Sequence, residues 1–87
     1  MKLTKIYCGS NNETKELELE KIKEVLSRWQ DNYTIILAKG CYKGGEEDTA
    51  IIEIYGNYNF GIISELKREL KQESILIVKS IVEVTFH

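Results

Sequence analysis

Residues that commonly carry out covalent chemistry or bind metals are few in this sequence and lie far apart. The thiols are Cys8 and Cys41, and the only histidine is His87. A zinc site needs several such ligands, and a nucleophilic cysteine or serine needs a neighbouring base, for which His87 is the one candidate. We therefore expect no catalytic residue, no metal and no cofactor, and a protein that is not an enzyme.

One short segment combines charge with glycine. The carboxylates Glu46, Glu47 and Asp48 are of the type that act as general acids or bases or that bind Mg²⁺, but they also suit a charged turn that keeps a hairpin soluble. The preceding Lys43-Gly44-Gly45 does not form a P-loop, which requires a strand before it and a helix after it. The segment is interpreted as the tip of a hairpin.

Composition indicates a small globular domain. The chain has 87 residues, of which 43% are hydrophobic and 30% are charged, and its net charge is −2. This length supports a single domain, residues 1–87, with little surplus stability, so that association would help it. The charge predicts no binding to nucleic acid. Without a signal peptide or a long apolar run, we expect a cytoplasmic protein with reduced thiols and no membrane partner.

Apolar patterns predict four strands. One is expected at Leu3–Cys8, two form a hairpin within Tyr33–Gly56, and the last is expected at Ser74–Phe86. The hairpin, whose turn is expected at Tyr42–Glu47, is the most regular stretch of the chain.

Two helices are predicted between these strands. The first begins at a capping box made by Ser10 and Glu13, or at Asn12, and continues to about Trp29. The second begins after Asn59 and continues to about residue 72. The apolar stripes that these helices would bury are Leu19, Ile22, Val25, Leu26 and Trp29 in the first and Phe60, Ile63, Leu66 and Leu70 in the second.

The order β-α-β-β-α-β predicts an α+β protein with the ferredoxin-like fold. In this fold a four-stranded antiparallel sheet has the spatial order 4-1-3-2, and right-handed crossovers put both helices on one face. A parallel βαβ repeat is the alternative topology. The short connection between the second and third strands argues against it.

This topology gathers three connections at one end of the sheet, namely Gly9–Asn12, Tyr42–Glu47 and Gln72–Ser74. The N-terminus of the first helix would open there with free amides that suit an anion, and a tyrosine ring could stack on a base. We predict a site for a small anionic, nucleotide-like ligand at this end, although a solvated loop edge is the alternative. Its expected residues are Ser10, Asn11, Asn12, Lys39, Tyr42, Lys43 and Gln72.

Apolar residues also occupy both faces of the later strands. If the helices cover Ile6, Ile36, Ile52 and Val82, the opposite face presents too much apolar surface for a monomer. An error of one residue in the register would exchange the faces of a strand, but one buried face cannot account for both sets. We therefore expect a homo-oligomer, with an open face made of Tyr33, Ile35, Leu37, Ile51, Tyr55, Ile75, Ile77 and Ile81.

The phrase NYTIILAKGCYKGGEEDTAIIEI resembles a strand–turn–strand pattern of small ferredoxin-like proteins of bacteria and phages. In that pattern, "GxTv…GxW+G…E" is followed by a helix and a "QEsvL" strand. Tyr42 replaces its tryptophan, and Asn32-Tyr33 replaces its first glycine and the next residue. The residues at the corresponding positions are Tyr33, Thr34, Gly40, Tyr42, Gly44 and Glu47, then Gln72-Glu73-Ser74-Ile75-Leu76.

The architecture is also similar to that of the PII-like signalling proteins, trimers that bind nucleotides in clefts between subunits. Their long loop between the second and third strands is missing here. In size and class the chain resembles phage anti-defence proteins that sequester nucleotide immune signals. These resemblances imply an oligomer that binds a nucleotide and has no catalytic residues.

Three functions follow in order of preference. The first is a non-enzymatic oligomer that binds the nucleotide-like ligand, by sequestering a signal molecule for example. The second is an interaction module, such as a phage inhibitor, that docks on a host protein through the open face. The third is a small enzyme of the dimeric α+β-barrel type, with Glu53, Lys79 and Glu83 as its polar cluster.

Overall fold

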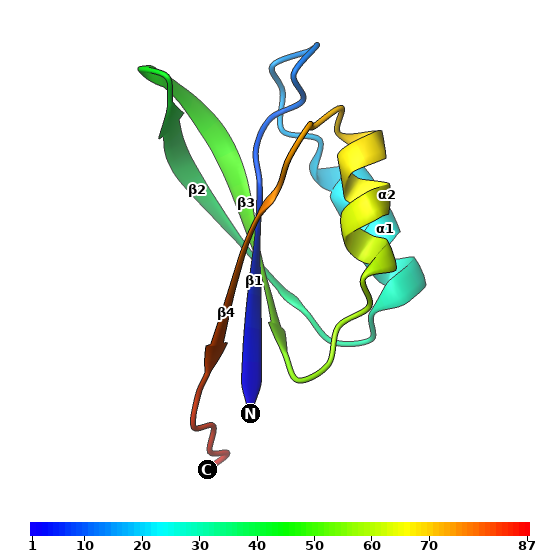
Figure 1. The fold of residues 1–87 in the computed structure, drawn as a ribbon, viewed down its shortest axis with the longest axis vertical. Coiled ribbons are helices and arrows are strands. Elements are labelled where there is room, and N and C mark those ends of the chain that lie inside the picture. Colours follow the sequence, from blue (N-terminus) through cyan, green and yellow to red (C-terminus); the bar gives the residue numbers. More distant parts are fainter.

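The computed structural model describes residues 1–87, and its elements follow the predicted order (Figure 1). Neither helix combines the length and the apolar composition that crossing a lipid bilayer would require. The strands are β1 (Lys2–Cys8), β2 (Thr34–Tyr42), β3 (Gly45–Tyr55) and β4 (Leu76–Ile81), and the helices are α1 (Leu19–Trp29) and α2 (Gly61–Glu69).

The predicted ferredoxin-like α+β fold is confirmed. The four strands form one sheet in the order β2-β3-β1-β4, and every neighbouring pair is antiparallel. Both helices lie on the same side of this sheet, while the β2–β3 hairpin extends past them at one end (Figure 1). The hairpin therefore has a distal half that no helix covers.

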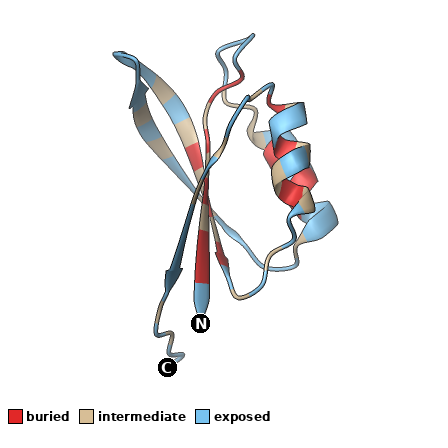
Figure 2. Cartoon of the chain, viewed as in Figure 1, coloured by how far each residue is buried: buried red, intermediate tan, exposed pale blue.

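The core lies between the sheet and the two helices, where the buried residues of Figure 2 concentrate. Alternate residues of β1 and β3 point into it, as the period of a strand requires. Each helix contributes one apolar stripe. The fully buried large side chains include Ile6, Ile52 and Ile54 from the sheet, Ile22 and Leu26 from α1, and Ile62 and Leu66 from α2.

α1 begins at Leu19, later than predicted. The side-chain oxygen of Asn11 accepts hydrogen bonds from the amides of Glu13, at 2.7 Å, and Thr14, at 3.2 Å. A side chain that takes up these amides stabilises a local turn in place of a helix. The Ser10–Glu13 capping box and the cap at Asn12 were therefore wrong predictions, and residues 9–18 form a loop.

α2 is also shorter than predicted, and its buried stripe differs. Phe60 lies before the helix with 73% of its surface exposed, whereas Ile62 is fully buried. The helix ends in a Schellman motif, in which Lys71 adopts a φ of +54° and the Gln72 amide bonds to the Lys67 carbonyl at 3.0 Å. This turn carries Gln72 back towards the end of β1.

The faces of β2 and β4 are the reverse of those predicted. Ile35 lies opposite Ile52 and packs on the core, while Ile36 lies opposite Ile51 and is 42% exposed. A shift of one residue exchanges the two faces of a strand, and β2 is apolar on both. The predicted open face was right for Ile51 and Tyr55. It was wrong for Ile35, Leu37, Ile75, Ile77 and Ile81, which lie on the helix side. Tyr33, also predicted on the open face, and Val82, predicted on the helix side, lie outside the strands.

We define the open face by the residues that do point away from the helices. Leu76 is 61% exposed and Val78 is 41% exposed in the edge strand β4. At the centre of the face Lys5 and Glu53 lie opposite each other, with 3.7 Å between the ammonium and a carboxylate oxygen. The larger residues of the open face are Ile36 from β2, Ile51, Glu53 and Tyr55 from β3, Leu3, Lys5 and Tyr7 from β1, and Leu76 and Val78 from β4.

One carboxylate links the two helices. Glu65 of α2 accepts hydrogen bonds from the indole N–H of Trp29 and from the guanidinium of Arg28, and its side chain is only 13% exposed. Trp29 was predicted to be a core residue, but 42% of its surface is exposed. The hydrogen bond from Trp29, followed by the hydrogen bond and the charge of Arg28, holds the pKa of Glu65 below its ordinary value of 4.5.

This pKa shift predicts how stability depends on pH. A carboxylate with a depressed pKa stabilises the fold above pH 4.5, and the contribution is lost as the pH falls through the folded-state pKa. We expect Glu65→Gln to lower the melting temperature by a few degrees at pH 7 and by less at pH 3, where more of the native carboxylate is protonated. Melting curves of this variant and of Glu69→Gln, a control on the same helix whose carboxylate forms no ion pair, would measure the difference. An equal loss at both pH values would contradict a role for the charge.

Candidate functional site

Six of the seven predicted site residues line one cleft at the end of the sheet where the hairpin tip lies. This hairpin-end cleft has a volume of about 560 Å³ and is lined by residues of the β1–α1 loop and of the hairpin. The β1–α1 loop and the hairpin tip lie at the same end of the molecule (Figure 1). The seventh residue, Gln72, lines a groove of about 570 Å³ that shares four residues with the cleft, namely Asn12, Tyr42, Lys43 and Glu47. The six residues of the cleft are Ser10, Asn11, Asn12, Lys39, Tyr42 and Lys43.

Three of these polar residues build the loop wall of the site. The Ser10 hydroxyl donates to the Asp48 carbonyl at 3.1 Å, and the Gln72 side chain donates to the Ser10 carbonyl. Asn11 is only 3% exposed and uses its oxygen within its own turn. These hydrogen bonds are made within the protein, and they hold the loop that shapes the cleft. Asn12 is the exposed amide of the group.

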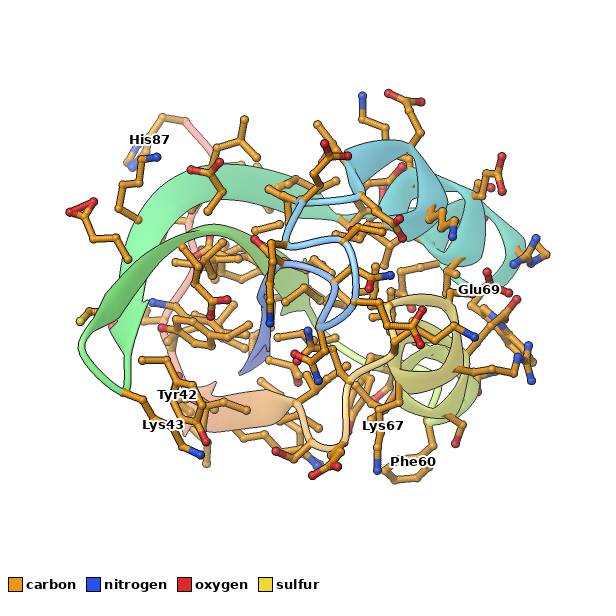
Figure 3. The ribbon with its side chains drawn as sticks, turned by 90° about the horizontal axis from the view of Figure 1, so that it is seen from above. Tyr42, Lys43, Phe60, Lys67, Glu69 and His87 are labelled. Atoms are coloured by element: carbon orange, nitrogen blue, oxygen red, sulfur yellow. The ribbon has the colours of Figure 1, made fainter.

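The tip of the hairpin presents the exposed residues of the site. Its turn is shorter than predicted, because β2 continues to Tyr42 and β3 resumes at Gly45. Lys43 has a φ of +51° and Gly44 a φ of +80°, the signs of a two-residue type I′ turn. Tyr42 is 69% exposed, and the Lys43 ammonium lies 5.4 Å from the centre of its ring (Figure 3). The tight turn holds a ring and a cation together.

Both signs of charge line the cleft. Lys39 forms an ion pair with Asp48, which raises the pKa of Lys39 through the hydrogen bond first and through charge second. Lys15 and Lys43 have no ion-pair partner, and the carboxylates of Glu46 and Glu47 lie on the same cleft. Such a surface suits a ligand that has one anionic group and also N–H donors.

The N-terminal amides of α1, which we predicted to bind an anion at this site, do not contribute to the cleft. None of its residues lines the cleft. Its first turn already carries negative charge, because Glu20 lies there and the carboxylate of Glu18 sits 3.2 Å from the Lys21 ammonium. These carboxylates interact favourably with the partial positive charge at the N-terminus of the helix. The prediction that the N-terminus of this helix faces the site was therefore wrong.

Lys15 lines the cleft but was not among the predicted site residues. The residue was assigned to the helix, whereas it adopts a φ of +64° in the loop and lines the cleft. Asn11 was the signal that could have located it, because an asparagine whose side chain accepts from the amides two and three residues further along favours a turn.

The structure does not assemble the polar cluster of the third predicted function. Glu53 lies on the open face, opposite Lys5. Lys79 lies opposite Thr4, which is a helix-side residue of β1, and Glu83 follows the end of β4. The alternation of side chains along a strand separates Glu53 from Lys79 by the thickness of the sheet.

The two thiols differ in environment. Cys8 is fully buried, and burial raises the pKa of its thiol to about 12, whereas Cys41 is exposed. A buried thiol with a raised pKa is a poor nucleophile. No group of three histidine, cysteine, aspartate or glutamate side chains is arranged to hold a metal ion.

Comparison with known proteins leaves the family of the chain open. No family model matches the sequence, and no curated protein matches it. Function must therefore be inferred from the chemistry of the surfaces described above.

Proposed function

We propose that this protein is a non-enzymatic, cytoplasmic binding protein that takes up a small anionic, nucleotide-like ligand in the hairpin-end cleft. The observation that carries the proposal is the pairing of an exposed ring, Tyr42, with the ammonium of Lys43 on a tight turn. Aromatic side chains bind bases by stacking, and lysine binds phosphate. The fixed turn limits the entropy that binding would lose.

The remaining charges of the cleft define the ligand further. A base stacked on Tyr42 would offer its N–H groups to the carboxylates of Glu46 and Glu47, and its phosphate would lie near Lys43 and Lys15. Because the cleft has as many carboxylates as lysines, it favours a nucleotide with one or two negative charges over a triphosphate. Mononucleotides and cyclic nucleotides are the preferred class.

Variants at the tip test this proposal. Lys43→Asn removes the charge and keeps the turn, because Asn-Gly is a preferred type I′ pair, and Tyr42→Ala removes the ring. In a melting scan against mono-, di- and cyclic nucleotides, we expect wild type to be stabilised by at least one of them. Either variant should bind that nucleotide about tenfold more weakly or worse by calorimetry.

The control for this experiment is Lys67→Gln, which removes an exposed lysine of α2 that does not line the cleft and lies apart from Tyr42 and Lys43 (Figure 3). It should bind like wild type. A scan without any stabilising nucleotide, or full affinity in both tip variants, would refute the proposed ligand.

We propose further that the functional unit is a homodimer joined through the open face. Four large apolar side chains there are at least 41% exposed, namely Ile36, Tyr55, Leu76 and Val78. They surround the Lys5–Glu53 pair. In a two-fold pairing of identical faces, each lysine can meet the glutamate of the second copy, so the face is complementary to itself in charge. If the protein is a monomer, docking of a different protein on this face becomes the alternative function.

A further inference from the structure

A second cavity lies at the other end of the helix side of the sheet. It has a volume of about 430 Å³, within the range typical of small-molecule sites. We call it the aromatic cavity and define it by Lys2, Thr4, Tyr58, Phe60, Lys79 and Ile81. It shares no lining residue with the hairpin-end cleft.

The sheet places two lysines side by side in this cavity. Lys79 lies opposite Thr4 across the β1–β4 pair, and Lys2 is two residues from Thr4 on the same face. Diagonal neighbours of this kind are roughly 7–8 Å apart, close enough for one small anion to contact both ammonium groups. Thr4 is 3% exposed and lies deep in the cavity.

The segment that precedes α2 supplies an aromatic wall. The rings of Tyr58 and Phe60 meet edge to face, with 5.5 Å between their centres. The Lys79 ammonium lies 5.1 Å from the centre of the first ring and 5.7 Å from the second. Tyr58 packs on the core, but Phe60 is 73% exposed and juts out on the α2 side of the molecule (Figure 3). Part of the aromatic wall is thus free to stack on a ligand.

Neither lysine has a carboxylate partner in the protein. No carboxylate oxygen lies within 4.0 Å of either ammonium, and no acidic residue lines the cavity. Adjacent like charges are unfavourable on a sheet, and a bound anion would relieve that repulsion. The hairpin-end cleft differs in this respect, because its lysines are matched by carboxylates.

We propose that the aromatic cavity binds a planar aromatic molecule that bears a single anionic group, either a carboxylate or a phosphate. The anion contacts the ammonium groups of Lys2 and Lys79, and the ring stacks on Phe60 with the Ile81 side chain at its edge. A cation close to two rings is held in place before the ligand arrives, which reduces the entropy lost on binding. The site is separate from the one proposed at the hairpin tip.

Four probes test this assignment by amide chemical shifts of the labelled protein. They are 2-naphthoate, 1-naphthyl phosphate, the neutral 2-naphthamide and the non-aromatic cyclohexanecarboxylate. We expect one or both aromatic anions to shift the amides of Lys2, Phe60 and Lys79, and the comparison of the two shows which anionic group is preferred. The neutral and the non-aromatic probes should each bind about tenfold more weakly or worse, because each lacks one of the two contacts.

Variants complete the experiment. Lys79→Gln and Phe60→Ala should each weaken binding of the better anion about fivefold or more, and both positions are exposed enough for the fold to tolerate them. Lys67→Gln should leave the affinity unchanged. Equal binding of the charged and neutral naphthalenes, shifts confined to the open face or the hairpin tip, or no shifts at millimolar probe would each overturn the proposal.

Discussion

Replacing Ile52 by alanine should lower the free energy of unfolding by about 2–5 kcal/mol, the largest effect expected of a single truncation in this chain. Ile52 is fully buried in β3, opposite Ile6 on one side and Ile35 on the other. A domain of this length is stable by only about 4–13 kcal/mol. The expected loss is therefore a large fraction of the total stability.

The buried thiol offers a sensitive measurement of this effect. Cys8 is fully buried with a pKa of about 12, so at pH 8 it reacts with a thiol reagent only when the protein opens. Exposed Cys41 should react at once in every variant. In Ile52→Ala we expect the labelling rate of Cys8 to rise roughly 30-fold or more, in proportion to the unfolded population.

Leu37→Ala provides the matched control. Leu37 is an aliphatic residue on the helix side of β2, but 62% of its surface is exposed because the hairpin extends beyond the helices. Its truncation should raise the labelling rate only slightly, since little apolar area is lost from the core. Equal rates in the two variants would contradict the assignment of Ile52 to the centre of the core.

Leu76→Lys should convert the proposed homodimer to a monomer, the second large effect. Leu76 is 61% exposed, so lysine is tolerated by the single domain, whereas in a dimer it would be buried without a partner. We expect the dissociation constant to rise about 100-fold or more, and sedimentation or light scattering across a concentration series would measure it. Lys67→Glu, a charge change on the helix side, should leave the dimer intact.

Charge-reversal variants distinguish a Lys5–Glu53 contact between two copies of the chain from one within a single copy. Lys5→Glu makes the open face acidic and Glu53→Lys makes it basic, so each variant alone should fail to pair with itself. A mixture of the two should form a heterodimer, because opposite charges then meet across the interface. A wild-type protein that stays monomeric at high concentration, or a mixture that does not associate, would contradict the dimer.

The two proposed sites differ in how far apart in the sequence their residues lie. At the hairpin tip, Tyr42 and Lys43 are adjacent in sequence, so the turn alone brings ring and cation together. In the aromatic cavity, Lys2, Phe60 and Lys79 come from three distant parts of the chain. The first pairing was predictable from the sequence, and the second required the β1–β4 register.

By itself, the sequence determined the order of elements, the strand order and most of the lining of the hairpin-end cleft. Alternation in β1 and β3, the helical period from Ile22 to Leu26 and the short hairpin turn are local signals, and few topologies satisfy them together. Three loops necessarily gather at one end in that topology. This is why Ser10 and Gln72 could be placed near the tip before their contacts were known.

Only the tertiary structure decided the faces of β2 and β4, the start of α1 and the composition of the aromatic cavity. β2 is apolar on both sides, so its pattern does not specify which of Ile35 and Ile36 faces the core; pairing with Ile52 does. The start of α1 depends on which amides the Asn11 side chain captures. For each of these features the local sequence permits two conformations of almost equal energy. Packing across the sheet selects one of them.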